Sequence, residues 1–122
     1  MGAAHYIVLE KKIDGLDTMM DGKSLSRHIK SLDKAALELG VRPLSEFFSM
    51  DPDTLADIIG DAIDDMEVRP VTQFSAQDGL TTVRALLSRP EAKPAILDLQ
   101  ACERILNVAA QHGVCWHFQI DI

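Results

Sequence analysis

The densest group of side chains that could bind a metal ion lies near the C-terminus, in the stretch HGVCWH. It contains His112, Cys115 and His117, and imidazole and thiolate groups are ligands that suit zinc and copper. If the residues after Gly113 form a β-strand, Cys115 and His117 emerge from one face about 7 Å apart. His112 could then reach them across the turn before the strand, and the three residues would form a zinc or copper site.

A structural interpretation of the same residues competes with the metal site. His112 would end a helix, where the helix dipole favours a partly positive ring, and Cys115 and His117 would lie on a half-exposed face of the strand. One cluster of ligands without a second cluster is a weak metal-binding pattern. We therefore expect no cofactor, and a protein that binds a metal or small ligand at His112, Cys115 and His117 is the alternative hypothesis.

The stretch DTMMDGKS, residues 17–24, ends like a phosphate-binding loop but lacks its chemistry. In such a loop a glycine begins the turn and backbone amides wrap the phosphates. Asp17 stands in place of that glycine and Asp21 precedes the GKS triplet, so two negative charges occupy the position of the anion. We interpret Asp21 or Ser24 as a helix cap instead.

No catalytic residue can be assigned from sequence motifs. The chain contains no G-x-S-x-G, H-E-x-x-H or glycine-rich dinucleotide-binding motif. The sequence therefore favours a non-enzymatic protein.

Two features favour contacts with another protein. Met19 and Met20 are adjacent in a polar segment, where one face cannot readily bury both, and methionine adapts to varied partners. The structural alternative is that at least one of them packs in the core. Acidic residues concentrate in residues 51–67, and Asp57 and Asp61 have the spacing of one helix face. This face is either a solvated surface or a docking surface for a basic protein.

These side chains must be positioned by secondary structure, which the hydrophobic pattern predicts. Strands are predicted in HYIVLE, residues 5–10, and in VCWHFQIDI after Gly113, where apolar and polar residues alternate. Helices are predicted over residues 24–39, 51–63, 75–89 and 95–112, where apolar residues recur at steps of three and four. Gly40 would end the first helix, Ser75 would cap the third, and SRPEAKPA would be a linker.

The predicted fold class is α+β, with about four helices packed on a small sheet that includes the N-terminal and C-terminal strands. Residues 1–122 are enough for a single globular domain with one core. The stretch VRPLSEFFSM is expected to form a helical turn that places Phe47 and Phe48 in that core.

The charge and the cysteine content narrow the classes of partner. Twelve Lys and Arg against nineteen Asp and Glu give a net charge of −7, which repels nucleic acids and anionic membranes. No apolar run approaches the roughly 20 residues of a membrane span. The start of the chain lacks the pattern of a signal peptide, so a cytoplasmic location is expected. The two cysteines fit reduced thiols in that compartment.

As a whole, the chain resembles a family of small bacterial proteins whose function is unknown. The resemblance spans most of the length and rests on HYIVLEKKIDGLDTMMDGKSL, RPLSEFF, FSAQDGLTTVRALL and HGVCWHFQIDI. It implies a bacterial, cytoplasmic source and supplies no catalytic residue. The sequence thus predicts a small acidic interaction or regulatory module that uses Met19, Met20, Asp57 and Asp61 to bind a basic protein or another copy of itself.

Overall fold

The computed structural model of the chain describes residues 4–49 and 72–121. In chain order the elements are β1 (Ala4–Leu9), α1 (Lys23–Arg27), α2 (Ile29–Leu39), the 3₁₀ helix η1 (Leu44–Phe47), α4 (Ala76–Leu87), the 3₁₀ helix η3 (Pro90–Ala95), α5 (Ile96–Gln111) and β2 (Trp116–Asp121). The helix predicted over residues 51–63 lies outside the described residues.

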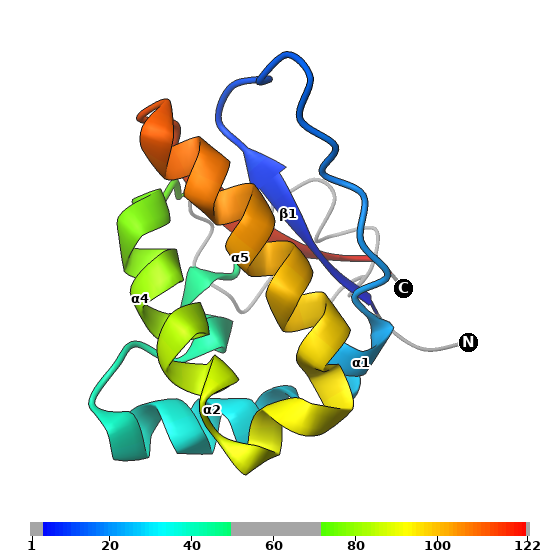
Figure 1. Cartoon of the computed structure of the whole chain (residues 1–122), viewed down its shortest axis with the longest axis vertical. Coiled ribbons are helices and arrows are strands. Elements are labelled where there is room, and N and C mark those ends of the chain that lie inside the picture. The colour runs from blue at the N-terminus through cyan, green and yellow to red at the C-terminus, as the bar shows by residue number, and fades with distance from the viewer. Residues whose placement is uncertain (1–3, 50–71, 122) are drawn as a thin grey trace, which may run out of the picture.

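The two strands form an antiparallel pair, with Ala4 opposite Asp121 and Leu9 opposite Trp116. Segments from the two ends of the chain thus meet in one sheet, and α4 and α5 lie side by side across one face of it (Figure 1). Helices stacked on one face of a small antiparallel sheet make an α+β fold. The predicted fold class and the predicted pairing of the terminal strands are confirmed.

The inward face of β2 supplies the centre of the core. Trp116 and Phe118 are fully buried, as the alternation of the last strand predicted. The Trp116 ring stacks on Phe47 with the ring centroids 4.9 Å apart and meets the edge of Phe118 at 4.7 Å. The Trp116 Nε1–H donates a 3.0 Å hydrogen bond to the Ser75 carbonyl oxygen, which satisfies the polar end of the indole. Phe48 is only half-buried, so of the two phenylalanines expected in the core only Phe47 lies there, together with Leu44 of η1.

Two helices replace the single helix predicted over residues 24–39. The break lies at His28, whose φ of −111° and ψ of 13° are not helical. The reason is tertiary, because α1 is fastened to β1 and α5 while α2 packs against α4 and η1. Gly40 ends α2 with a φ of 75°, as predicted.

The segment SRPEAKPA is not the linker that its composition suggested. Residues 90–95 form η3, and Ala92 and Ala95 are buried against the core. A proline at the start of a helical segment loses no hydrogen bond, so Pro90 is compatible with this turn. The Ser75 cap is confirmed, because its hydroxyl accepts a 3.2 Å hydrogen bond from the Gln77 N–H at the start of α4.

Among the helices of residues 4–49 and 72–121, none has the length and apolar character needed to cross a lipid bilayer.

Candidate functional site

Alternate residues of β1 direct their backbone N–H and C=O groups toward β2 and away from it. The Glu10 N–H donates a 2.8 Å hydrogen bond to the Cys115 carbonyl oxygen, directly after the last residue pair of the two strands. The backbone N–H and C=O groups of the even-numbered residues of β1 therefore point toward β2. Those of His5, Ile7 and Leu9 point to the opposite side, which we call the outer edge of β1.

The far side of β2 follows the same alternation and is covered by other parts of the chain. Phe74 and Trp116 exchange backbone hydrogen bonds of 2.7 and 2.9 Å, and the Ser49 N–H donates to the Phe118 carbonyl oxygen at 3.0 Å. The backbone groups of Trp116 and Phe118 thus bond to segments on the side of β2 that is opposite β1, as the register requires. The sheet is therefore covered on the β2 side.

Among residues 4–49 and 72–121, the outer edge of β1 is hydrogen-bonded only at His5, its first odd-numbered residue. The His5 N–H donates a 3.1 Å hydrogen bond to the Gly22 carbonyl oxygen. Within the described parts of the chain, the outward backbone groups of Ile7 and Leu9 have no hydrogen-bond partner. Ile7 is only 5% exposed, and backbone groups so far from bulk water are nearly always paired in folded proteins. The outer edge therefore offers donors and acceptors that no described residue uses.

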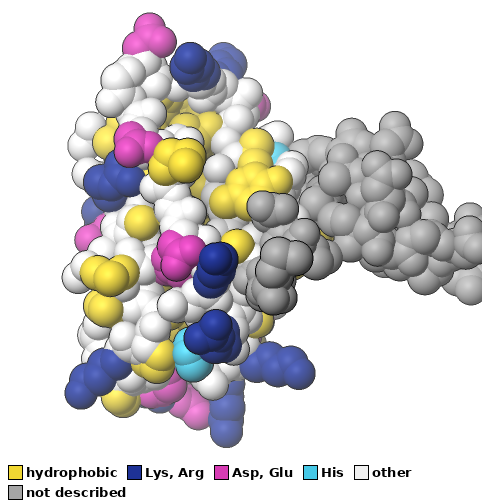
Figure 2. Space-filling view, turned by 90° about the vertical axis from the view of Figure 1, so that its right-hand side faces the viewer, with side chains coloured by type: hydrophobic (Ala, Val, Ile, Leu, Met, Phe, Trp, Pro, Cys, Tyr) yellow, Lys and Arg dark blue, Asp and Glu magenta, His cyan; other side chains and the backbone are white. Residues whose placement is uncertain are grey.

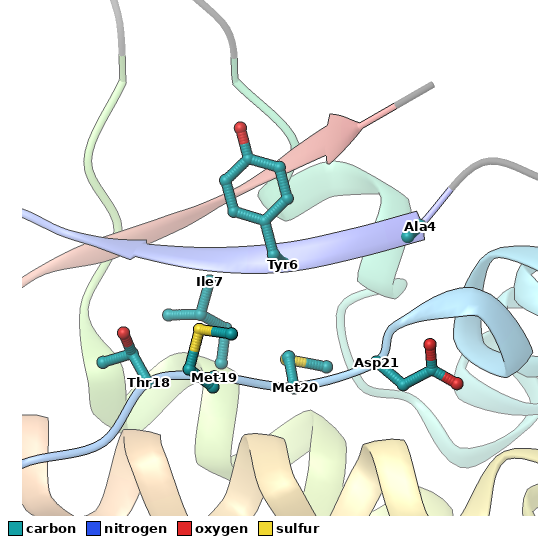
Figure 3. A pocket seen from close by; sticks show the side chains of 7 residues that line it. All are labelled: Ala4, Tyr6, Ile7, Thr18, Met19, Met20 and Asp21. Atoms are coloured by element: carbon teal, nitrogen blue, oxygen red, sulfur yellow. The ribbon is translucent and has the colours of Figure 1, made fainter.

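Two cavities lie along this edge, between β1 and residues 11–21. One has a volume of about 550 Å³ and is lined by Ala4, Tyr6 and Ile7 from β1 and by Thr18, Met19, Met20 and Asp21 opposite (Figure 3). The other, of about 320 Å³, is lined by Ile7, Val8 and Leu9 and by Lys11, Lys12, Ile13, Leu16 and Thr18. Ile7 and Thr18 line both cavities, which are therefore adjacent, and together we call them the β1 groove.

The wall of the groove opposite β1 is held by contacts from α5. The Arg104 guanidinium donates a 2.7 Å hydrogen bond to the Asp17 carbonyl oxygen, and the Asp17 carboxylate accepts one of 2.9 Å from the Met19 N–H. Residues 10–22 form the edge of the molecule in Figure 1, and the view onto that side shows hydrophobic patches among charges of both signs (Figure 2). The groove therefore lies at the surface between fixed walls.

Asp98 fixes the end of this wall and resolves the question that the GKS triplet raised. Its buried carboxylate accepts hydrogen bonds of 3.0 Å from both the Gly22 and the Leu25 N–H groups. The amides that would wrap a phosphate are thus occupied by a carboxylate of the same chain. The prediction of a cap from Asp21 or Ser24 is wrong, since Gly22 is the cap residue and neither side chain bonds the helix.

Gly22 brings this wall against β1. It has a φ of 72°, and a Cβ atom there would lie 1.8 Å from the His5 carbonyl oxygen. Only glycine allows both the left-handed backbone and this close approach. Gly22 therefore closes the groove at the His5 end.

The predicted partner-binding residues fall into two groups. Met19 is 80% exposed and Met20 packs against the core, and both line the β1 groove. Met20 thus has the structural role, and the exposed Met19 is available to contact a partner. Asp57 and Asp61 lie outside the described residues, and their role stays a prediction.

The structure does not assemble His112, Cys115 and His117 into a metal site. His112 is exposed at the C-cap of α5, Cys115 is half-buried, and His117 is 2% exposed rather than half-exposed as expected. Across the described ranges, no group of three or more His, Cys, Asp or Glu side chains could hold a metal ion. Metal binding stays a prediction, which elemental analysis of natively purified protein tests.

His117 instead belongs to a chain of hydrogen bonds on the face of the sheet opposite Trp116 and Phe118. The Tyr6 hydroxyl donates to Gln119 Oε1 at 2.9 Å, and Gln119 Nε2 donates to His117 Nε2 at 2.9 Å. His117 Nδ1–H donates to Gln73 Oε1 at 3.0 Å. These roles require a neutral imidazole, and burial lowers the pKa of His117, which favours that form. The lone pair that a metal would need is already used.

A second histidine contact resembles part of a catalytic pair. His5 Nδ1 is hydrogen-bonded to the Ser26 hydroxyl, and burial lowers the pKa of His5 while the Asp33 carboxylate partly offsets that shift. Activation of a serine nucleophile also requires a place for substrate. Neither cavity of the β1 groove is lined by His5 or Ser26. We therefore interpret this contact as one that fastens α1 to β1.

Sequence reasoning missed Asp98 and the outer edge of β1. Asp98 had a detectable signal, because it shares the helical spacing of the buried residues Cys102, Ile105 and Ala109. An acid on an apolar stripe indicates a buried partner. The open edge had no signal, since nothing local to β1 shows which strand or segment lies beside it.

Comparison with known proteins gives no relative: no family model, curated protein or solved structure matches the chain.

Proposed function

We propose that this chain is a non-enzymatic interaction module that binds a partner protein at the β1 groove. The observation that carries this proposal is Met19, which is 80% exposed at the groove while the neighbouring Met20 packs against the core. A flexible, polarisable side chain beside a cavity of this size suits adaptable protein contacts.

The acidic residues on the wall opposite β1 favour a partner with basic residues. Asp14, Asp17 and Asp21 are exposed on the wall opposite β1. The chain as a whole carries a net charge of −7. Exposed charges of opposite sign speed association and are screened beyond about 8 Å at physiological ionic strength. The acidic face expected at Asp57 and Asp61 would add to this attraction, and a bacterial cytoplasm is the proposed location.

Affinity capture with point variants tests the proposal. Full-length protein is immobilised and incubated with bacterial lysate at increasing salt, and the bound proteins are identified by mass spectrometry. We expect specific basic proteins to be captured, to be lost as salt rises, and to be lost with Met19→Asp. Charge reversal at Asp57 and Asp61 should weaken their capture.

The control is Leu97→Asp, because Leu97 is 77% exposed on α5 but does not line the groove. This variant should capture the same proteins as the unaltered chain. Equal capture by the Met19→Asp variant would show that the groove is not the binding site.

A further inference from the structure

We propose that the β1 groove takes an extended peptide segment of the partner, which adds a strand to the outer edge of β1. This inference rests on the proposed function and names its mode of recognition. In strand addition, backbone hydrogen bonds supply affinity and the pockets for alternate side chains supply specificity.

The backbone of β1 presents the pattern that an added strand needs. Ile7 and Leu9 are two residues apart, about 7 Å along the strand, and both direct an N–H and a C=O toward the groove. These groups find no partner in the part of the chain that the structure describes. An added strand would use them in the same way that β2 uses the even-numbered residues.

The shape of the groove favours a single extended segment over the edge of another folded sheet. The wall formed by Thr18, Met19 and Met20 stands opposite β1, so the edge is flanked rather than open (Figure 3). A second copy of the chain would have to bring its own flanking wall to the same place. A single strand brings no wall of its own.

The ends of the groove specify which segment fits. The contact of Gly22 with His5 closes one end, so the added strand pairs with Ile7 and Leu9 and stops there. The open end carries the exposed Lys11 and Lys12, while Asp21 is exposed at the closed end. Charge complementarity therefore points to a peptide with an acidic residue near Lys11 and Lys12, an apolar middle, and a basic residue near Asp21.

Selection from a display library identifies the segment. The probe is a phage-displayed library of random peptides about ten residues long, and the target is the full-length protein. We expect selected peptides to alternate apolar residues between an acidic and a basic end, and to lose at least about tenfold in affinity against the Met19→Asp variant.

Backbone N-methylation of a selected peptide tests for strand pairing without altering the protein. Each methyl group removes one N–H donor, so positions that face β1 should lose about five- to tenfold in affinity and the positions between them should lose little. The resulting loss repeats every second residue. Leu9→Pro is the matching protein variant, because it removes an N–H that faces the groove and none that faces β2; it should weaken binding while circular dichroism shows the fold retained.

The two proposals fail in different ways. A peptide that needs Met19 but tolerates N-methylation at every position would overturn strand addition and leave the interaction module standing. A library that yields no Met19-dependent peptide, or a chain that dimerises through this edge instead, would also overturn the peptide-binding mode. Equal lysate capture by the Met19→Asp variant would overturn the proposed function itself.

Discussion

Asp98 joins three parts of the molecule through one buried carboxylate. It lies in the first turn of α5 and accepts the Gly22 and Leu25 N–H groups at the start of α1. Gly22 in turn accepts the His5 N–H at the outer edge of β1. A short helix such as α1 has little stability by itself, so this carboxylate holds both the helix and the closed end of the groove.

Replacing Asp98 with alanine should destabilise the fold strongly. The variant loses two hydrogen bonds to a charged group and leaves two N–H groups without an acceptor, which costs about 2–4 kcal/mol of unfolding free energy. Urea denaturation measures the change. The control is Asp78→Ala, since Asp78 is an exposed acid in the first turn of α4 and should cost only about 0.5 kcal/mol.

The two buried histidines link stability to pH. Burial lowers the pKa of His117, and it lowers the pKa of His5 although Asp33 partly offsets the shift. In the unfolded chain a histidine has its ordinary pKa of about 6.5. Between the folded and unfolded pKa values the unfolded chain binds more protons, so stability is complete above about pH 6.5 and is lost as the pH falls below it.

The free energy of unfolding should therefore decrease between pH 7.5 and 5.5, by at most about 1.4 kcal/mol per pH unit for each histidine. Urea denaturation at a series of pH values measures this slope. In a His117→Gln variant the slope should become smaller. A slope that does not respond to His117→Gln would contradict the assignment.

At the scale of elements, the contact between α4 and β2 depends on the absence of a side chain at Gly79. A Cβ atom at this position would lie 2.4 Å from Cζ2 and 2.8 Å from Nε1 of the Trp116 ring. Because Gly79 is inside a helix, it also makes α4 about 1 kcal/mol less stable than alanine would at the same position. The indole thus packs directly on the helix backbone.

Gly79→Ala should lower the free energy of unfolding by about 1–2 kcal/mol, because the overpacking penalty exceeds the gain in helix propensity. The fluorescence of Trp116, the only tryptophan of the chain, reports the urea transition. In a Trp116→Phe background, followed by circular dichroism, the same substitution should cost much less, since the clashing atoms are gone. An equal cost in both backgrounds would show that Trp116 is not the cause.

At the scale of the whole molecule, the pairing of β1 with β2 joins the two ends of the chain around one core. Cys102 lies at the centre of that core, fully buried on α5, and burial raises the pKa of its thiol, assisted by the negative charge of Asp98. Cys115 is half-buried and lines a surface cavity of about 180 Å³. The reaction of Cys115 with a thiol reagent therefore reports surface access, and the reaction of Cys102 reports opening of the core.

In native protein, a thiol reagent should modify Cys115 directly and Cys102 only when the whole core opens. The time course of modification should show one fast and one slow phase, and the slow phase should accelerate with urea. A Cys115→Ser variant should lack the fast phase. If both thiols of the native chain react at one rate, the core around Cys102 opens locally and the expectation is wrong.

How much of the molecule could be predicted depends on the range of the interactions involved. The C-terminal end of α2 and the start of α4 were predictable, because Gly40 and Ser75 act on the adjacent turn of backbone. The break at His28 and the turn at residues 90–95 were not, since they arise from packing against elements distant in sequence. The spacing of Cys115 and His117 suggested metal ligands, but it could not show that Gln73 and Gln119 are hydrogen-bonded to the His117 ring.

By itself, the sequence determined the class of fold, the inward face of β2 and the presence of two methionines in a polar segment, because hydrophobic alternation and composition are properties of local chain. Only the tertiary structure decided that Asp98 accepts the Gly22 and Leu25 N–H groups and that Ile7 and Leu9 face a groove. Both depend on which distant segment lies beside a given backbone group. A one-dimensional pattern does not contain that placement, since it follows from the packing of the whole chain.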